Sequence, residues 1–179
     1  MFEDYLEDSN YFAIEASKAS NEREAKRYYR VSVFCAMSAV EAFINYIGDT
    51  LAQGEVFPLY EIAFLTDKKF DISGGTFQIL DQMEYHKFED KLKFLICKFV
   101  PDFDFDKTSC WSRLLELKKL RDTITHPRQD EDEIDIAEYQ RKLTIGLGSA
   151  IEIMNYLSKG IFKRPLRKKL LDLSVTDNV

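Results

Sequence analysis

The chain has 179 residues, of which 45% are hydrophobic, 31% charged and 13% aromatic, and this composition is that of a globular protein rather than a disordered one. A chain of this length fits one domain and can bury roughly 70% of the surface that its unfolded form exposes. Its formal net charge of −6 excludes a protein that coats nucleic acid through overall charge, because nonspecific phosphate binding requires a basic surface.

Apolar side chains recur at helical spacing along most of the chain, which predicts an all-α protein. The seven glycines and four prolines are few for the many turns of an all-β fold. We expect an up-and-down helical bundle of four to six helices, with residues 1–160 as a single domain and residues 161–179 as a basic tail that forms a short helix packed on the body. The helical patterns cover approximately residues 2–19, 21–53, 59–65, 85–99, 109–125 and 135–160.

Residues with capping chemistry indicate where several of these helices begin and end. Asn21 and Asp135 each precede a glutamate by three residues, the spacing of a capping box, and Ser109 stands at the start of another helical pattern. Gly54 and Gly160 follow the two longest patterns and predict their C-terminal ends.

Two segments lack a clear helical pattern. From Phe57 to Ile79 the helical pattern weakens, and after the short helix expected at residues 59–65 the residues Asp67-Lys-Lys, Asp71 and Gly74-Gly75 predict an irregular connection. Residues 101–106 alternate apolar and acidic side chains, and we expect an ordered loop there, anchored by its aromatic side chains, rather than a strand.

Glu41 and Asn45 interrupt the apolar arc of the longest helical pattern. They are four residues apart and therefore share one face of the helix. One interpretation is a hydrogen-bonded polar pair that holds a neighbouring helix, and the other is a pair that lines or orients a site. Under either interpretation each buried polar group requires a partner.

The pattern over residues 109–125 places an arginine on its packing face. At 100° per residue, Arg121 falls within the arc of about 120° that its leucines occupy, whereas Lys118 and Lys119 fall outside it. A guanidinium is planar, always charged and able to bind two oxygens at once, which suits a phosphate. The alternative is an arginine paired with a buried carboxylate such as Glu41.

His126 follows that arginine by five residues and precedes Pro127. A residue before proline is disfavoured in the α region, so the helix is expected to end near His126 and to leave the imidazole free to turn toward Arg121. Histidine is the side chain best suited to proton transfer at neutral pH. Arg121 and His126 are therefore the candidate catalytic residues.

An arginine and a histidine, without a nucleophilic serine or cysteine at recognisable spacing, suit the transesterification of RNA. The 2′-hydroxyl of the substrate attacks its own phosphate, so the protein only moves protons and stabilises charge on the phosphoryl oxygens. Attack and departure occur on opposite sides of phosphorus, which requires a base and an acid. A symmetric homodimer that brings two copies of the pair together would supply both.

The stretch from Arg121 to His126 resembles the signature of the HEPN superfamily, an arginine and a histidine separated by four to six residues with a polar residue directly after the arginine. The segment Leu117-Lys-Lys-Leu120 before it and residues 38–45 are also similar to the family's helices. The resemblance covers most of residues 20–160.

This resemblance implies a dimeric α-helical bundle that acts as a metal-independent endoribonuclease without a cofactor and leaves a 2′,3′-cyclic phosphate. Members of the superfamily serve as toxins of toxin-antitoxin pairs, in phage defence and in RNA processing. Carried over by position, Arg121 would stabilise the phosphate, His126 would transfer protons and Asp122 would orient the motif. Glu41 and Asn45 would be supporting wall residues.

One departure from the family concerns the second residue after the histidine. HEPN toxins that are paired with a nucleotidyltransferase often carry a tyrosine there, and this chain has Arg128. Control by modification of that tyrosine is therefore not expected, and Arg128 is a candidate RNA contact. Lys163, Arg164 and Arg167 in the basic tail are further candidates, although the same tail could be a solvated helical face.

Other features predict a cytoplasmic protein without a structural metal. Cys35, Cys97 and Cys110 form an odd set without CxxC spacing, and His86 has no second ligand at metal-binding distance along the sequence. The first residues lack the order of a signal peptide, and no stretch approaches the ~18 uncharged apolar residues of a membrane span.

Two functions compete with the ribonuclease. One is a non-enzymatic helical dimer that binds RNA or a protein, in keeping with the acidic net charge. The other is an antitoxin-like or regulatory module that contacts a partner through the basic tail.

Overall fold

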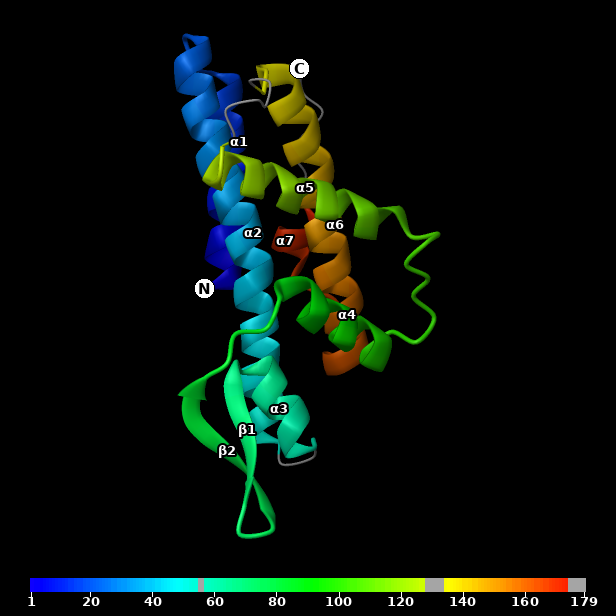
Figure 1. Cartoon of the computed structure of the whole chain (residues 1–179). Coiled ribbons are helices and arrows are strands. Elements are labelled where there is room, and N and C mark those ends of the chain that lie inside the picture. Colours follow the sequence, from blue (N-terminus) through cyan, green and yellow to red (C-terminus); the bar gives the residue numbers. More distant parts are fainter. Residues whose placement is uncertain (55–56, 128–133, 174–179) are drawn as a thin grey trace. The chain divides into compact units, whose positions relative to one another are not determined.

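The computed structural model describes residues 1–54, 57–127 and 134–173, which form seven helices and one antiparallel pair of strands (Figure 1). In chain order the elements are α1 (Phe2–Ser17), α2 (Glu22–Gln53), α3 (Leu59–Leu65), β1 (Lys68–Ser73), β2 (Thr76–Met83), α4 (Phe88–Phe99), α5 (Ser109–Thr125), α6 (Ile136–Phe162) and α7 (Lys168–Leu171). The mostly helical character is confirmed. Six of the helices in the described residues, α1–α6, begin within residues 1–160, and the seventh, α7, lies in the predicted tail.

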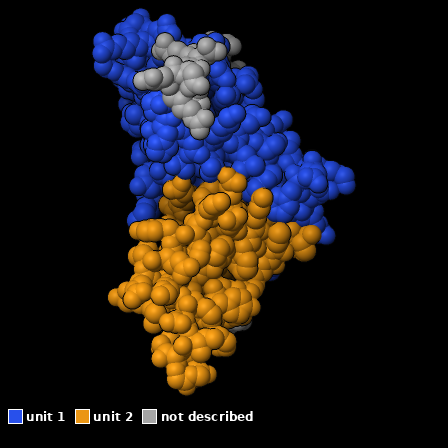
Figure 2. All heavy atoms as spheres, viewed as in Figure 1, with its two compact units in different colours: residues 1–40, 102–179 blue, residues 41–101 orange. Residues whose placement is uncertain are grey.

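The chain divides into two compact units (Figure 2). Unit 1 comprises residues 1–40 and 102–179, and unit 2 comprises residues 41–101. The helix α2 contributes its first part to unit 1 and its last part to unit 2. The described part of the predicted tail, residues 161–173, groups with unit 1.

The pair α5 and α6 forms the best-packed part of unit 1. Leu114, Leu117 and Leu120 of α5 are at most 1% exposed, as the helical periodicity predicts. Gly146 of α6 faces this row so closely that a Cβ atom placed on it would lie 2.7 Å from the Cβ of Leu117. The lack of a side chain at Gly146 therefore lets the two helices approach each other.

The loop before α5 is held by aromatic side chains. The ring of Phe105 meets Trp111 edge to face at 5.0 Å between centroids, and the ring of Phe103 meets Tyr156 of α6 at 5.7 Å. The prediction of an ordered loop with anchoring aromatics at residues 101–106 is confirmed for this unit. These contacts fix the start of α5 against α6.

The tail helix α7 packs on α1 and α6. Leu166, just before this helix, and Leu170 within it are buried. Two of its cations make ion pairs with α1: an Arg167 Nη1 atom lies 3.1 Å from a Glu3 carboxylate oxygen, and the Lys169 ammonium lies 2.6 Å from Glu7.

In unit 2, the segment predicted as an irregular connection is a β-hairpin, and that prediction is wrong. Gly74 and Gly75 both have positive φ, as a two-residue type I′ turn requires, and β1 and β2 pair directly on either side of them. Phe70 stacks on Phe77 across the hairpin at 5.3 Å. The alternation of apolar residues around the glycine pair was the signal for a hairpin.

Side-chain caps begin two of the helices as predicted. The Asn21 carboxamide oxygen accepts from the Glu24 N–H at 3.0 Å, and the Asp135 carboxylate accepts from the Glu138 N–H at 2.7 Å. Each cap satisfies one N–H of the first helical turn that has no partner within the helix.

The other predicted ends are right in one case and wrong in two. Gly54 follows the last residue of α2, as expected. Ser109 is the first residue of α5 and not its cap, and Thr108 before it makes no side-chain capping bond. The α6 helix continues past Gly160 to Phe162, and it is Lys163 that adopts the left-handed conformation, with φ of 57°.

Within the described ranges, one helix is long and apolar enough to cross a membrane by length and composition. This helix is α2, which contains an 18-residue window that is mostly apolar and has at most two charged residues. The expectation that no stretch approaches such a window is therefore wrong. Of this window, 56% is buried inside the structure, and a core helix of a soluble protein passes the same test.

Candidate functional site

The C-terminal end of α5, in unit 1, carries the candidate catalytic residues. Arg121 follows the buried Leu120 directly, and its side chain is 26% exposed. On the same helix Lys118 is half-buried and Lys119 is exposed. The guanidinium thus lies at the margin of the packed face, where it is partly shielded from water and still accessible.

A carboxylate lies between two cations at this helix end. One oxygen of Asp122 is 3.2 Å from Arg121 Nε, and the other oxygen is 2.9 Å from the Lys118 ammonium. The Thr125 hydroxyl donates to the Arg121 carbonyl at 2.8 Å. A carboxylate beside Nε restricts the orientation of the guanidinium.

His126 ends the helix as the following proline predicts. Its backbone has φ of −127° and ψ of 65°, outside the α region, and its N–H still donates to the Asp122 carbonyl at 2.9 Å. The His126 residue is exposed to solvent. The structure therefore joins Arg121 to Asp122 through side chains and Asp122 to His126 through the backbone.

The remaining candidate RNA contacts differ in their surroundings. Arg128 lies outside the described residues. Lys163 and Arg164 are exposed at the end of α6, where the Lys163 ammonium donates to the Gly160 carbonyl at 2.6 Å. Arg167 is 73% exposed although it pairs with Glu3. Acidic residues of α1 thus offset part of the positive charge of the tail.

Glu41 and Asn45 belong to unit 2 and line a small polar pocket of about 220 Å³. The pocket is also lined by Asp67, His86 and Lys91, together with apolar atoms of α2 and α4. Both interpretations of Glu41 and Asn45, a pair that holds a neighbouring helix and a pair that lines a site, stay predictions. The alternative partner of Arg121, Glu41, lies in the other unit, and that pairing stays a prediction.

A buried ion pair next to these residues was not predicted from the sequence. The Lys91 ammonium, in a residue only 4% exposed, lies 2.5 Å from an Asp67 carboxylate oxygen, and the other oxygen accepts from the His86 N–H at 2.9 Å. Asp67 has φ of +54°, an uncommon conformation for a residue other than glycine. The His86 ring packs on Phe64 at 4.7 Å, which supports a structural histidine there.

Other groups that could carry chemistry do not form a site. Among the described residues, no three histidine, cysteine or acidic side chains cluster in a way that could hold a metal ion. Cys110 is 1% exposed, and burial, helped by nearby Glu152, raises the pKa of its thiol to about 11. Because the thiolate is the nucleophile, Cys110 is inert at neutral pH.

Comparison of the chain with protein-family models, with curated proteins and with solved structures finds no match.

Proposed function

We propose that this chain is a HEPN-like, metal-independent endoribonuclease whose working form is a cytoplasmic homodimer with an up-and-down helical bundle. The observation that supports it best is the end of α5. There a half-buried arginine, Arg121, is oriented by Asp122, and a histidine, His126, is released from the helix one turn later. This combination supplies a phosphate-binding cation and a proton carrier.

The proposed reaction is cleavage of RNA by its own 2′-hydroxyl. The 2′-oxygen forms a bond to phosphorus while the bond from phosphorus to the 5′-oxygen breaks, which leaves a 2′,3′-cyclic phosphate and a free 5′-hydroxyl. His126 of one copy accepts the 2′ proton, and His126 of the second copy donates a proton to the departing 5′-oxygen. Arg121 stabilises the negative charge on the non-bridging oxygens.

The acidic net charge limits the length of RNA that the chain is expected to contact. A chain of charge −6 does not hold RNA through a wide basic surface, so binding relies on local cations. Arg121, Arg128 and the exposed residues Lys163 and Arg164 supply these. A short single-stranded or loop segment fits such a limited contact area, and a toxin or phage-defence role with a protein antitoxin suits an enzyme of this kind.

The test is cleavage of labelled single-stranded RNA by the purified chain with a chelator present. We expect cyclic-phosphate ends from the wild type and loss of cleavage by about 10²-fold or more in both Arg121→Ala and His126→Ala. Lys119→Ala is the matched control, because Lys119 is an exposed cation on the same helix. Equal cleavage by wild type and His126→Ala would refute the proposal.

A non-enzymatic helical dimer that binds RNA or a protein is the second candidate function. The observation that favours it is the pairing of Arg167 and Lys169 with Glu3 and Glu7, which makes the tail a structural element that can present its remaining cations to a partner. RNA binding without wild-type-specific cleavage would support this function. Truncation after Gly160 tests a regulatory role of the tail, which predicts loss of partner binding.

A further inference from the structure

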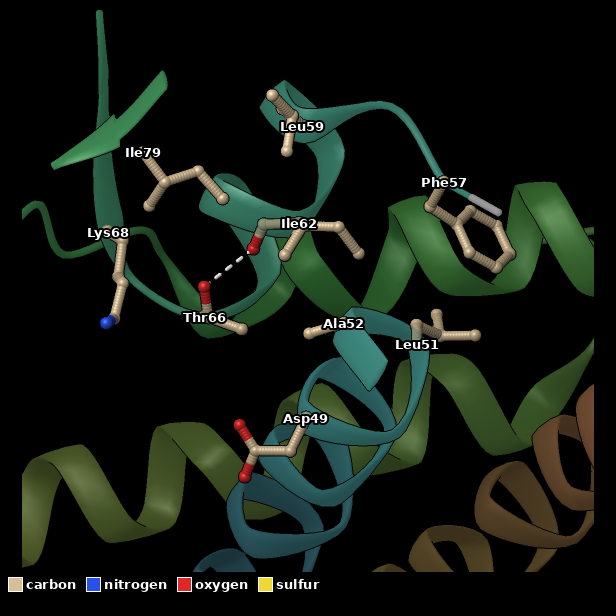
Figure 3. Close-up of a pocket in the computed structure, with 9 residues that line it drawn as sticks. All are labelled: Asp49, Leu51, Ala52, Phe57, Leu59, Ile62, Thr66, Lys68 and Ile79. Atoms are coloured by element: carbon tan, nitrogen blue, oxygen red, sulfur yellow. Dashed lines mark hydrogen bonds between the residues drawn. The ribbon is translucent and has the colours of Figure 1, made fainter. Parts of the chain in front are cut away.

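Unit 2 contains a cavity of about 710 Å³ at the C-terminal end of α2 (Figure 3). This volume lies within the range of ~300–1,000 Å³ that is typical of small-molecule sites. The ribonuclease proposal does not use this cavity. Its lining comes from α2, α3 and the hairpin and consists of Asp49, Leu51, Ala52, Phe57, Leu59, Ile62, Thr66, Lys68 and Ile79.

Six of the nine lining residues are apolar. Leu51 and Ile62 are under 10% exposed and form a fixed wall, whereas Leu59 is 45% exposed although it borders the cavity. The Thr66 hydroxyl donates to the Ile62 carbonyl at 2.7 Å, as Figure 3 shows, so its own donor is already used. An apolar group in the cavity therefore gains by covering these side chains.

Two charged side chains, Asp49 and Lys68, lie at the edge of the apolar group (Figure 3). Lys68 has a nearby carboxylate, since its ammonium lies 3.6 Å from Asp81 on the neighbouring strand. Among the described residues, Asp49 makes no ion pair. The negative charge of Asp49 is thus less neutralised by neighbouring side chains than the positive charge of Lys68.

The end of α2 adds to this negative potential. The last turn of this 32-residue helix carries no basic side chain, so no cation of its own offsets the partial negative charge of its terminal carbonyls. Leu51 and Ala52 belong to that last turn and line the cavity. A cation placed here is favoured by both the carboxylate of Asp49 and the helix end.

We propose that this cavity binds a small hydrophobic amine. An alkyl or aryl body lies against Phe57, Leu59 and Ile62, and a protonated amino group faces Asp49. Neutral compounds with the same body bind more weakly because they gain only the apolar contact, and acids bind weakest because their charge opposes Asp49 and the helix end.

The experiment compares three compounds that share one apolar body: 4-phenylbutylamine, 4-phenylbutanol and 4-phenylbutyrate. Each is titrated into the full chain at pH 7, with calorimetry for affinity and amide NMR shifts for location. The expected order is amine, alcohol, acid, with roughly tenfold between amine and alcohol, since that corresponds to one close charge interaction. The shifts are expected at residues 49–79. No binding of any compound, or equal binding of all three, overturns the proposal.

Variants connect the preference to particular residues. Asp49→Asn should retain alcohol binding and abolish the advantage of the amine, whereas Lys68→Met should strengthen amine binding. Asp90→Asn is the matched control, because Asp90 is an exposed acid of unit 2 outside the cavity lining. Ala52→Leu fills the cavity and should abolish binding of all three, with folding verified by thermal melting. An unchanged amine preference in Asp49→Asn refutes the assignment of the cation to that carboxylate.

Discussion

Arg121 makes an ion pair with its immediate neighbour in the chain, Asp122. Asp122 occupies Nε at 3.2 Å and also holds Lys118 at 2.9 Å. A guanidinium is able to make a planar, two-oxygen contact with a phosphate. A lysine at the same position would retain the charge and lose that geometry.

This difference leads to a prediction for Arg121→Lys. We expect RNA cleavage to fall on the order of 10²-fold, because one ammonium cannot hold two phosphoryl oxygens in a fixed orientation. The melting temperature should change little, since a charge of the same sign remains beside Asp122. Single-turnover cleavage and a thermal melt measure the two effects. Lys119→Arg is the control and should leave both unchanged.

Cys110 provides a prediction about stability at alkaline pH. Its pKa is raised from the ordinary value of 9.0 to about 11, chiefly by burial and then by Glu152. The native state therefore keeps the thiol proton where the unfolded chain has lost it. The resulting stability is fully present below pH 9 and is lost as the pH rises to 11, by on the order of 2 kcal/mol.

The measurement compares the free energy of unfolding of wild type and Cys110→Ala in urea between pH 8 and 10.5. Groups common to both proteins cancel in the difference, so the advantage of the wild type should shrink steadily over this interval. A difference that stays constant with pH would show that the native thiol ionises as readily as the unfolded one.

The packing of α5 on α6 depends on one glycine, and a second glycine two residues later serves as its control. Gly146→Ala would bring a Cβ to 2.7 Å from the Cβ of Leu117, while nothing lies within 4 Å of a Cβ at Gly148. We expect Gly146→Ala to destabilise the fold by about 1–3 kcal/mol through overpacking. Gly148→Ala should stabilise it by up to about 1 kcal/mol through helix propensity.

Urea unfolding of both variants checks this pair of predictions. Changes of opposite sign in the free energy of unfolding would distinguish the effect of the close helix contact from that of helix propensity. Two stabilised variants would mean that α5 can shift away from α6 at little cost. Such a shift would also displace Arg121, so RNA cleavage of Gly146→Ala reports whether the helix position matters for the proposed site.

Elements with a local cause could be predicted from the sequence. The caps at Asn21 and Asp135 depend on residues three apart, and the end of α5 depends on Pro127. The hairpin was missed because Gly74-Gly75 was interpreted as a break in structure rather than as the turn between two paired strands. An irregular connection and a hairpin turn contain the same types of residue. Only the alternation of apolar and polar residues in the flanking segments distinguishes a hairpin.

Contacts between distant residues could not be predicted. Asp67 and Lys91 are 24 residues apart, and neither lies in a sequence motif that predicts an ion pair. A buried lysine is uncommon without a partner, and here the partner comes from a distant part of the chain. The cavity at the end of α2 likewise combines residues from three elements. By contrast, Arg121 and Asp122 are adjacent in the chain, so their placement on α5 could be predicted from helical geometry alone.

The proposed mechanism requires two chains, because each supplies one histidine and the reaction uses a base and an acid. Specific activity should therefore depend on total protein concentration. At concentrations well above the dimer dissociation constant it should be constant, and on dilution below that constant it should fall in proportion to the fraction of dimer.

Sedimentation equilibrium gives the dimer fraction, and cleavage of a fluorescent RNA measured over the same dilution series gives specific activity. We expect the two curves to share a midpoint. A matched curve for Lys119→Ala should coincide with the wild type, because Lys119 is an exposed cation outside the proposed catalytic pair. Specific activity that stays constant while the dimer dissociates would mean that one chain contains the complete site, and the acid would then have to be a group other than a second His126.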